Sequence, residues 1–261
     1  MNGGFHNSVL IGHTGFVGGN LLRRHAFTHR YHSANIEELR GREAGLMVCA
    51  GVRAVKWWAN THPEEDRAGI ETLLDVLRDV RAGTFVLIST VDVYPNPAGV
   101  TEADEPEEEP RNAYGRHRLM VEHFVREHFD KTCILRLPGL FGDGLKKNVI
   151  YDLLHDNGLD RVQPESAYQY YDLKRLWDDM GTAMHRKIPL LNMATEPIRT
   201  RVLIDRFFPD KTVGGAAPVA HYDMRSQHAA AWGRSDGYLY GADDVLADLE
   251  VFIRRHRSDA S

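Results

Sequence analysis

Long apolar runs, cysteine and a dominant sign of charge are all scarce in this sequence of 261 residues, and each shortage excludes a class of protein. No stretch approaches the roughly 20 apolar residues that span a bilayer, and residues 1–5 lack the basic start and apolar core of a secretory signal. The net charge is only −5, with 32 basic residues scattered among 37 acidic ones, so the chain offers no basic footprint for nucleic acid. We therefore expect a cytoplasmic protein that binds neither membranes nor nucleic acid.

The two cysteines, Cys49 and Cys133, lie inside apolar, strand-like runs and do not make a disulfide framework. Thiols in such runs usually behave as small buried hydrophobic groups, so we expect neither to be functional. The acidic stretch Glu102–Pro110 has no His or Cys interleaved at ligand spacing, and its prolines prevent a regular element. We interpret this stretch as a solvated surface loop and expect no metal site.

What the sequence does contain is a regular alternation of short apolar runs with longer amphipathic stretches, typical of βαβ units around a parallel sheet. The runs that we expect to be strands are Ser8–Ile11, Leu46–Ala50, Phe85–Ser89, Thr132–Leu137 and Leu190–Met193. The stretches that we expect to be helices are Phe16–Ala26, Pro63–Val80, Tyr114–Phe129, Val149–His155, Leu173–His185 and Asp243–His256. With 43% apolar residues, the chain suffices for one α/β unit with a small appended lobe.

Three evenly spaced glycines connect the first expected strand to the first expected helix, in the run Val9-Leu10-Ile11-Gly12-His13-Thr14-Gly15-Phe16-Val17-Gly18. Gly12 can make a tight turn, Gly15 lets backbone amides approach a pyrophosphate, and Gly18 lets the helix lie close to the strand. The alternative is that these glycines only close a strand-to-helix turn. Their position after the first strand of a βα pattern favours a dinucleotide-binding turn.

This GxxGxxG spacing resembles that of the short-chain dehydrogenase/reductase family, in its extended branch of NAD-dependent epimerases and dehydratases of sugar nucleotides. The resemblance continues in chain order through Val48–Gly51, Phe85–Tyr94, Tyr114–Arg118, Leu135–Pro138, Leu140–Gly142, Gln169–Leu176 and Leu191–Ala194. It implies a Rossmann-type, doubly wound parallel sheet with a small C-terminal substrate-binding lobe. Residues 1–143 would form mainly the dinucleotide-binding core, and residues 144–261 a mixed substrate lobe with returning core elements, including the strand near 190–193.

The resemblance also implies an NAD(P) cofactor, which would lie against the first turn and the ends of the strands. The residues that it places there are Gly12, Thr14, Gly15, Phe16, Val17, Gly18, Ser33, Ala50, Gly51, Ser89, Tyr114, Arg118 and Leu137. An acid about 20 residues beyond the glycines would favour NAD. Here the second strand, near Arg30–His32, is followed by Ser33 instead, which favours NADP. Arg23 and Arg24 either add to this preference or are ordinary surface residues of the first helix.

Hydride transfer at a carbinol carbon needs a proton-transferring group and a second donor that holds the substrate oxygen. Tyr114 and Thr90 are the candidates, at the separation found in the family. The family has a lysine one helical turn after the tyrosine, where this chain has Arg118. An arginine keeps the charge that favours the phenolate but cannot give up its proton. The alternatives are that Tyr114 only packs on the sheet and that Thr90 only caps backbone groups.

Asp92 stands where the dehydratases of the family carry an acidic general base, or it is a turn-capping carboxylate. Those enzymes usually add a second acid just before it, where this chain has Val91. We therefore expect a reductase or an epimerase rather than a dehydratase.

For substrate binding, the resemblance points to Lys146, Lys147 and Asn148, because they follow the glycine-containing loop at which relatives begin to contact a substrate diphosphate. Adjacent lysines are also common on solvated surfaces. Weaker candidates of the same kind are Arg175, Arg199 and Arg201, and the pair Trp57-Trp58 would wall the pocket or belong to the core.

The leading hypothesis is an NAD(P)-dependent oxidoreductase or epimerase that acts on a nucleotide-linked sugar or a similar polar hydroxyl or keto compound. The second is a catalytically silent NAD(P)-binding sensor or partner-binding module, for which Arg118 is the best argument. A third is a homodimer built on the Tyr114–Phe129 helix, which is compatible with both.

Overall fold

A computed structural model describes residues 7–106 and 112–259, which divide into two compact units. Unit 1 consists of Met1–Asn96, Glu102–Leu137 and Lys174–Asn192, and unit 2 of Pro97–Thr101, Pro138–Leu173 and Met193–Ser261. The segment Lys174–Asn192 therefore returns to the unit that contains the glycine turn.

Unit 1 is built on a parallel sheet of six strands in the order β2-β1-β3-β4-β5-β9. The strands are β1 (Ser8–Ile11), β2 (His29–Tyr31), β3 (Glu43–Cys49), β4 (Arg81–Thr90), β5 (Thr132–Leu137) and β9 (Leu190–Asn192). The helices are α1 (Phe16–Arg24), α2 (Lys56–Thr61), α3 (Pro63–Leu77), α4 (Ala113–His128) and α6 (Leu176–His185), with 3₁₀ turns η1 (Ile36–Leu39) and η2 (Val91–Val93). This arrangement confirms the Rossmann-type α/β fold expected from the sequence.

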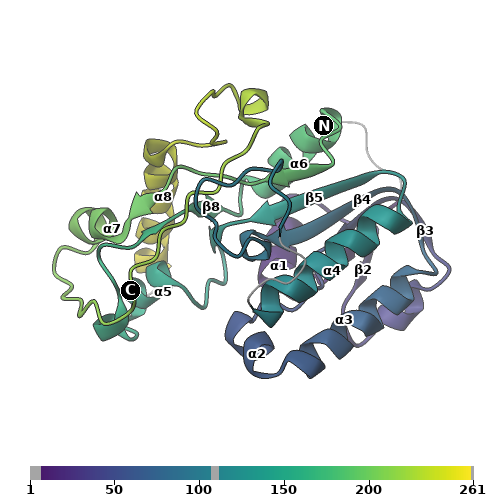
Figure 1. The fold of residues 1–261 in the computed structure, drawn as a ribbon, viewed down its shortest axis with the longest axis horizontal. Helices are drawn as coiled ribbons and strands as arrows, with labels where there is room; N and C mark the ends of the chain where they lie inside the picture. Colours follow the sequence, from purple (N-terminus) through teal and green to yellow (C-terminus); the bar gives the residue numbers. More distant parts are fainter. Residues whose placement is uncertain (1–6, 107–111, 260–261) are drawn as a thin grey trace. The chain divides into compact units, whose positions relative to one another are not determined.

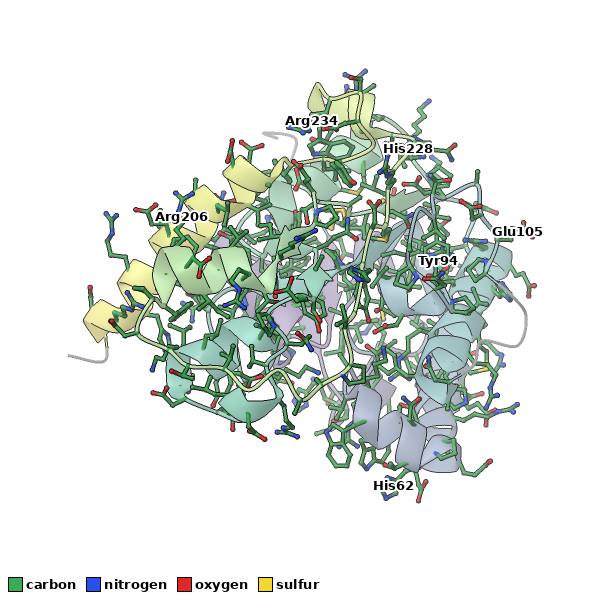
Figure 2. All side chains as sticks on the ribbon, turned by 60° about the vertical axis from the view of Figure 1, so that its left-hand side comes forward. His62, Tyr94, Glu105, Arg206, His228 and Arg234 are labelled. Carbon is green, nitrogen blue, oxygen red and sulfur yellow. The ribbon has the colours of Figure 1, made fainter. Side chains whose placement is uncertain are left out.

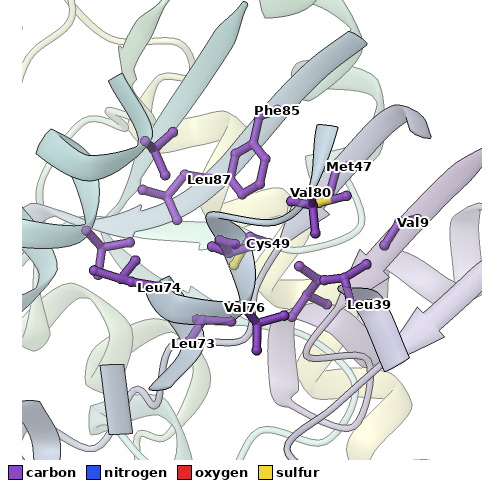
Figure 3. Packing of buried hydrophobic residues seen from close by; sticks show 14 of the residues in the cluster. Val9, Leu39, Met47, Cys49, Leu73, Leu74, Val76, Val80, Phe85 and Leu87 are labelled. Carbon is purple, nitrogen blue, oxygen red and sulfur yellow. The ribbon is translucent and has the colours of Figure 1, made fainter. Parts of the chain in front are cut away.

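Two layers of helices cover the sheet, which explains why its central strands are continuously apolar. In Figure 1, α3 and α4 lie side by side across one face, and α1 and α6, which contact each other, lie on the opposite side. Alternate strand residues enter the core under α3 and α4 because successive side chains of a strand point to opposite faces. Figure 3 shows this packing between Leu73, Leu74 and Val76 of α3 and the strand residues Cys49, Phe85 and Leu87.

The order of the strands places a topological switch point between β1 and β3. From β1 the chain moves outward to β2 and then crosses back to β3 on the other side of β1. In open α/β sheets, ligands bind in the crevice beyond the carboxyl ends of the strands at such a point. Gly12, after β1, and Ala50, after β3, lie at this crevice.

Several elements differ from their predicted bounds. α1 ends at Arg24 rather than Ala26, and β4 begins at Arg81 rather than Phe85, because Arg81 and Ala82 pair with β3. α6 begins at Leu176 rather than Leu173, since Tyr170–Asp172 form strand β8. Of the expected acidic loop Glu102–Pro110, only the part up to residue 106 belongs to the described residues, and it contains no regular element.

Unit 2 has its own apolar core between three helices and short strands. The helices are α5 (Val149–His155), α7 (Thr200–Phe207) and α8 (Ala242–Asp259), with 3₁₀ turns η3 (Leu159–Arg161) and η4 (Ala229–Trp232). The strands are β6 (Gly139–Phe141), β7 (Ala167–Tyr168), β8 (Tyr170–Asp172) and β10 (Ile198–Arg199), which pair as β6-β8 and β7-β10. Leu203, Leu249 and Phe252 are among the residues that join α7 and α8 in one hydrophobic cluster. Arg206 of α7, labelled in Figure 2, pairs with Glu250 of α8 at 3.2 Å.

Both cysteines are buried free thiols. Burial raises the pKa of Cys49 to about 11 and that of Cys133 to about 12, so neither thiol ionises near neutral pH. Within the described part of the chain, no helix is both long and apolar enough to cross a membrane. The same residues contain no cluster of three or more His, Cys, Asp or Glu side chains suited to a metal ion.

Candidate active site and cofactor turn

The glycine turn brings β1, α1 and the end of β3 into close backbone contact. Gly12 has a φ of +85°, and a Cβ built on it would lie 2.4 Å from the carbonyl oxygen of Ala50. A Cβ on Gly18 would lie 2.2 Å from the carbonyl oxygen of Gly12. Any larger residue at these two positions would force the strand ends and the helix apart. Gly12 and Gly18 are therefore required by the fold itself.

Gly15 differs from the other two glycines because its surroundings are open. It is the N-cap of α1 in an extended conformation, and a Cβ there would have a single close neighbour, the Gly12 carbonyl oxygen at 3.3 Å. The open side of Gly15 is thus available to a bound group. Thr14 beside it is exposed, and Phe16 and Val17 begin the helix.

The first turn of α1 has the properties of an anion site. Its backbone N–H groups have no partner within the helix, and no described side chain caps them. The first turn also contains no acidic residue that would repel a phosphate. The helix dipole adds partial positive charge at this end. These features fit the pyrophosphate of a dinucleotide.

The rim of this crevice includes two further cofactor candidates. Gly51 follows β3, and a Cβ there would lie 2.8 Å from the Ile11 side chain, so the chain needs a glycine beside β1. Ser33 lies exposed in the turn after β2. In the same turn, Asn35 accepts a hydrogen bond from the backbone of His32 at 2.8 Å. Arg24 forms an exposed ion pair with Asp178 of α6, at 3.1 Å.

Thr90 and Tyr114 meet at the carboxyl end of β4. The Thr90 hydroxyl lies close enough to the Tyr114 hydroxyl to lower its pKa. Thr90 is the last residue of β4, and Leu137, at the end of β5, pairs with it across the sheet. Tyr114 is buried in the first turn of α4, where its backbone N–H donates to Asn60 Oδ1 at 3.0 Å. The fold therefore brings together the two hydroxyls that the sequence analysis singled out.

Gly115 explains how the start of α4 comes so close to the end of β4. A Cβ at this position would lie 2.2 Å from the carbonyl oxygen of Asp92, so only glycine permits the approach. The helix is capped by Asn112, whose side chain accepts from the Gly115 N–H at 2.8 Å. The tyrosine is thus fixed by backbone contacts on two sides.

The acidity of Tyr114 is set by opposing effects. Burial raises the pKa of its hydroxyl and is the largest effect. The charge of Arg118 lowers that pKa, that of Asp92 raises it, and the hydrogen bond with Thr90 and the charge of Lys56 lower it. The pKa remains above its ordinary value. Arg118 thus acts in the direction expected from the sequence, but burial outweighs it.

Arg118 is buried in a network that ties α4 to α3. Its guanidinium donates to both carboxylate oxygens of Asp66, at 2.5 and 2.9 Å, and to the backbone carbonyls of Tyr114 and Arg53. His117 contacts the same Asp66 carboxylate at 2.8 Å. Burial raises the pKa of Asp66, but the hydrogen bonds from Arg118 and His117 and their charges outweigh it and leave the pKa lowered. A fork-shaped donor is needed to make these contacts simultaneously.

Asp92 lies in η2, directly beyond Thr90, and is paired with a cation from α2. Lys56 Nζ lies 2.6 Å from Asp92 Oδ1. The backbone N–H of Asp92 donates to Thr90 Oγ1 at 3.2 Å. The side chain of Asp92 is about one fifth exposed and that of Lys56 about two fifths. Asp92 therefore belongs to the same cluster as Thr90 and Tyr114.

Ser89 points to the other side of the strand, into a buried polar network. Its hydroxyl donates to Glu122 at 2.5 Å, and Arg136 pairs with Glu122 at 2.6 Å. Arg136 also donates to the Tyr94 hydroxyl at 2.6 Å; Figure 2 labels Tyr94. Tyr94 is in turn hydrogen-bonded to Asn192 of β9. Since the Ser89 hydroxyl is used inside the protein, its candidate contact with a cofactor is restricted to its backbone.

The expected substrate residues lie in unit 2, between β6 and α5. Lys146 and Lys147 are exposed. Asn148 caps α5, accepting from the N–H groups of Ile150 and Tyr151 at 3.0 and 3.2 Å, and donates to the Leu140 carbonyl at 2.8 Å. Its amide is therefore already used to fix the loop.

Sequence reasoning missed three residues that the structure places around Tyr114, namely Lys56, Asn60 and Asp66. Lys56 precedes the pair Trp57-Trp58, but a single lysine is not a motif. Trp57 is 69% exposed and so is not a core residue, while the guanidinium of Arg53 lies 3.9 Å from the centroid of the Trp58 ring. Asp66 reads in the sequence as an ordinary acid in the first turn of a helix.

Solved structures of similar fold include several enzymes of nucleotide-linked sugars. UDP-glucose 4-epimerase from Thermotoga maritima, solved with UDP-glucose, is 15% identical, with 98% of this chain and 100% of that one covered and a TM-score of 0.72. A dTDP-4-dehydrorhamnose reductase from Bacillus anthracis, solved with NADP, is 14% identical, with 98% and 100% covered and a TM-score of 0.71. UDP-N-acetylglucosamine 4-epimerase from Methanobrevibacter ruminantium is 12% identical, with 97% and 98% covered and a TM-score of 0.71. These likenesses establish the fold.

No curated protein sequence matches the chain significantly. The family model of the NAD dependent epimerase/dehydratase family matches residues 8–157, which is more than half of the chain. This range begins at β1 and includes the glycine turn, Thr90, Asp92, Tyr114 and Arg118. The chain therefore belongs to the NAD dependent epimerase/dehydratase family.

Proposed function

We propose that this protein is an NAD(P)-dependent reductase or epimerase that acts on a nucleotide-linked sugar. The observation that carries the proposal is the proximity of the Thr90 and Tyr114 side chains at the carboxyl end of β4. In sheets of this architecture, ligands bind beyond the carboxyl ends of the strands, where the glycine turn also lies. Two hydroxyls held together there form a site for a reacting oxygen.

The cofactor proposed for the turn is NAD(P), whose nicotinamide, when bound, would accept or supply a hydride. The amides at the start of α1 would hold its pyrophosphate, and the open side of Gly15 would admit it. We propose NADP as the preferred form, because Ser33 rather than an acid follows β2. A carboxylate there would repel the additional phosphate, whereas a hydroxyl can donate to it.

Tyr114 is the proposed proton-transfer group, and Thr90 is the proposed donor that orients the substrate oxygen. Thr90 would stabilise negative charge on that oxygen as the carbon–oxygen bond order changes. Tyr114 would give its proton to the oxygen during reduction and take it back during oxidation. Because its pKa is raised, the hydroxyl is protonated at neutral pH and is ready to donate.

The substrate class rests on the loop of unit 2 and on the relatives. Lys146 and Lys147 are exposed cations that could pair with a diphosphate. The similar epimerases and the reductase have nucleotide-linked sugars as substrates or bound molecules in their names. A dehydratase is less favoured, since Asp92 is engaged by Lys56 and is preceded by Val91 rather than by a second acid.

The proposal is tested by mass spectrometry of any nucleotide released from the purified protein, followed by assays with a panel of UDP- and dTDP-linked hexoses and 4-keto hexoses. Absorbance at the nicotinamide band reports net hydride transfer, and proton NMR of the sugar reports epimerisation. We expect turnover of at least one member of the panel.

A catalytically silent NAD(P)-binding module is the alternative, and the pairing of Arg118 with Asp66 is the observation that favours it. The Arg118→Lys variant separates the two. If the wild type binds NADPH but neither it nor Arg118→Lys transfers hydride or epimerises any member of the panel, the binding module replaces the enzyme.

A further inference from the structure

The cations near Tyr114 differ in what they can do. Arg118 stays charged at every pH that the protein tolerates, is buried, and is held by both oxygens of Asp66. Its guanidinium lies against the face of the Tyr114 ring rather than in the plane of the hydroxyl, at 4.0 Å from the ring centroid. Its charge lowers the pKa of the Tyr114 hydroxyl more than that of Lys56 does, but the fold fixes this contribution.

Lys56 reaches the same site from another element. It begins α2, and its ammonium lies 2.6 Å from Asp92. Asp92 in turn contacts Thr90 through its backbone N–H, and its carbonyl oxygen lies against Gly115, the residue after Tyr114. The same helix supplies Asn60, whose side chain holds the Tyr114 N–H. One short helix thus contacts both the backbone of the tyrosine and the acid beside it.

We propose that Lys56 and Asp92 form a positioning pair that adjusts the acidity of the Tyr114 hydroxyl and holds the Thr90–Tyr114 contact in place. Lys56 supplies a titratable, solvent-contacting ammonium, a role for which the buried and permanently charged Arg118 is unsuited. Asp92 anchors that ammonium and opposes its effect on the tyrosine. The inference deepens the proposed function and rests on it for the role of Tyr114.

The two members of the pair shift the pKa of Tyr114 in opposite directions. Removing the Lys56 charge leaves Asp92 unbalanced and should raise the pKa of Tyr114. Removing the Asp92 charge leaves Lys56 unbalanced and should lower it. Removing both should cancel much of each effect. A loosened structure alone would not shift the pKa of Tyr114 in opposite directions in the two variants.

The other charged groups around Tyr114 must stay constant in the test. They are Arg118 and His117 on α4, Asp66 on α3, and Arg53 and His62, which lie before and after α2. The pKa of Asp66 is lowered, so this carboxyl does not change charge in the range in which a tyrosine ionises.

The experiment measures the acidity of residue 114 directly and needs no substrate. Tyr114 is replaced by difluorotyrosine, whose ring fluorines lower the phenol pKa into an accessible range and report ionisation by fluorine NMR. Titrations are run on the otherwise wild-type protein and on Lys56→Met, Lys56→Arg, Asp92→Asn and the double variant, each with and without NADP⁺. Lys131→Met is the matched control, because Lys131 is exposed and directly precedes β5, at the opposite end of that strand from the residue that pairs with Thr90.

We expect a higher midpoint in Lys56→Met, a lower one in Asp92→Asn, an intermediate one in the double variant, and little change in Lys56→Arg and Lys131→Met. Turnover by Lys56→Met at neutral pH should fall on the order of tenfold, and Lys56→Arg should retain part of the lost activity. Equal midpoints in all variants, or shifts of the same sign in Lys56→Met and Asp92→Asn, would overturn the inference. If the midpoints move as stated and no sugar nucleotide is turned over, the proposed function fails and the pair stands. If turnover occurs and the midpoints do not move, the pair fails and the function stands.

Discussion

The guanidinium of Arg118 covers the ring of Tyr114 from one helical turn away, with 4.0 Å between its central carbon and the ring centroid. The same group is fixed by Asp66 on the neighbouring helix. A lysine cannot lie over the ring and at the same time donate to both oxygens of Asp66 with the geometry of a guanidinium. Arginine at this position therefore has a structural reason in this chain, and the acidity of the tyrosine is influenced by groups from other elements.

The glycine turn gives a prediction about cofactor binding. Gly15→Val should fold, because a side chain there meets open space apart from one oxygen at 3.3 Å, but it should occupy the place proposed for the pyrophosphate. We expect NADPH affinity, measured by fluorescence titration, to fall by at least about tenfold. Gly19→Ala is the control, since its nearest atom would be 3.9 Å away. Unchanged affinity in a folded Gly15→Val protein would show that the turn is not the cofactor site.

The catalytic assignment predicts a separation between binding and turnover. Tyr114→Phe removes only the hydroxyl and should abolish turnover while leaving NADPH affinity nearly intact. Thr90→Ala should reduce kcat by roughly a hundredfold, as expected for the loss of one donor to the reacting oxygen. Steady-state kinetics measures kcat, and titration of the same preparations measures the dissociation constant of NADPH. Full activity of Tyr114→Phe would remove Tyr114 from the mechanism.

Cofactor preference should depend on Ser33. Ser33 is exposed after β2, so Ser33→Asp should not disturb the fold, and its carboxylate should weaken NADPH binding and favour NADH. Calorimetric titrations of NADPH and NADH into the wild type and the variant give the ratio of the two affinities for each protein. Tighter binding of NADH than NADPH by the wild type would contradict the preference that we propose.

Asp66 should be important for stability and for its dependence on pH. Asp66→Ala leaves Arg118 buried without its partner and should cost roughly 3–5 kcal/mol of unfolding free energy. Asp75→Ala, on the same helix and in an exposed ion pair with Arg40, should cost below about 1 kcal/mol. Urea unfolding at neutral pH measures both.

The sign of the pH effect follows from the lowered pKa of Asp66. A carboxylate whose pKa is lower in the folded state stabilises the fold above its ordinary pKa, and this contribution is lost as the pH falls through the lowered value. The wild type should therefore lose more stability than Asp66→Ala on acidification. Parallel curves for the two proteins would mean that the Asp66 pair does not stabilise the fold.

Local pattern in the sequence was enough to determine the fold class and the glycine turn between β1 and α1. Continuous apolar strands, helical periodicity and the spacing of Gly12, Gly15 and Gly18 are properties of neighbouring residues, and the Thr90 and Tyr114 candidates follow from the ends of the elements that carry them. The tertiary structure alone decided which charges surround the tyrosine. Lys56 and Asp66 come from α2 and α3, far along the chain from α4, and their contacts with Asp92 and Arg118 arise only when these elements pack on one sheet edge. A sequence orders such residues by chain position, whereas the charge–charge energies that set the pKa of Tyr114 depend on distance and burial in space.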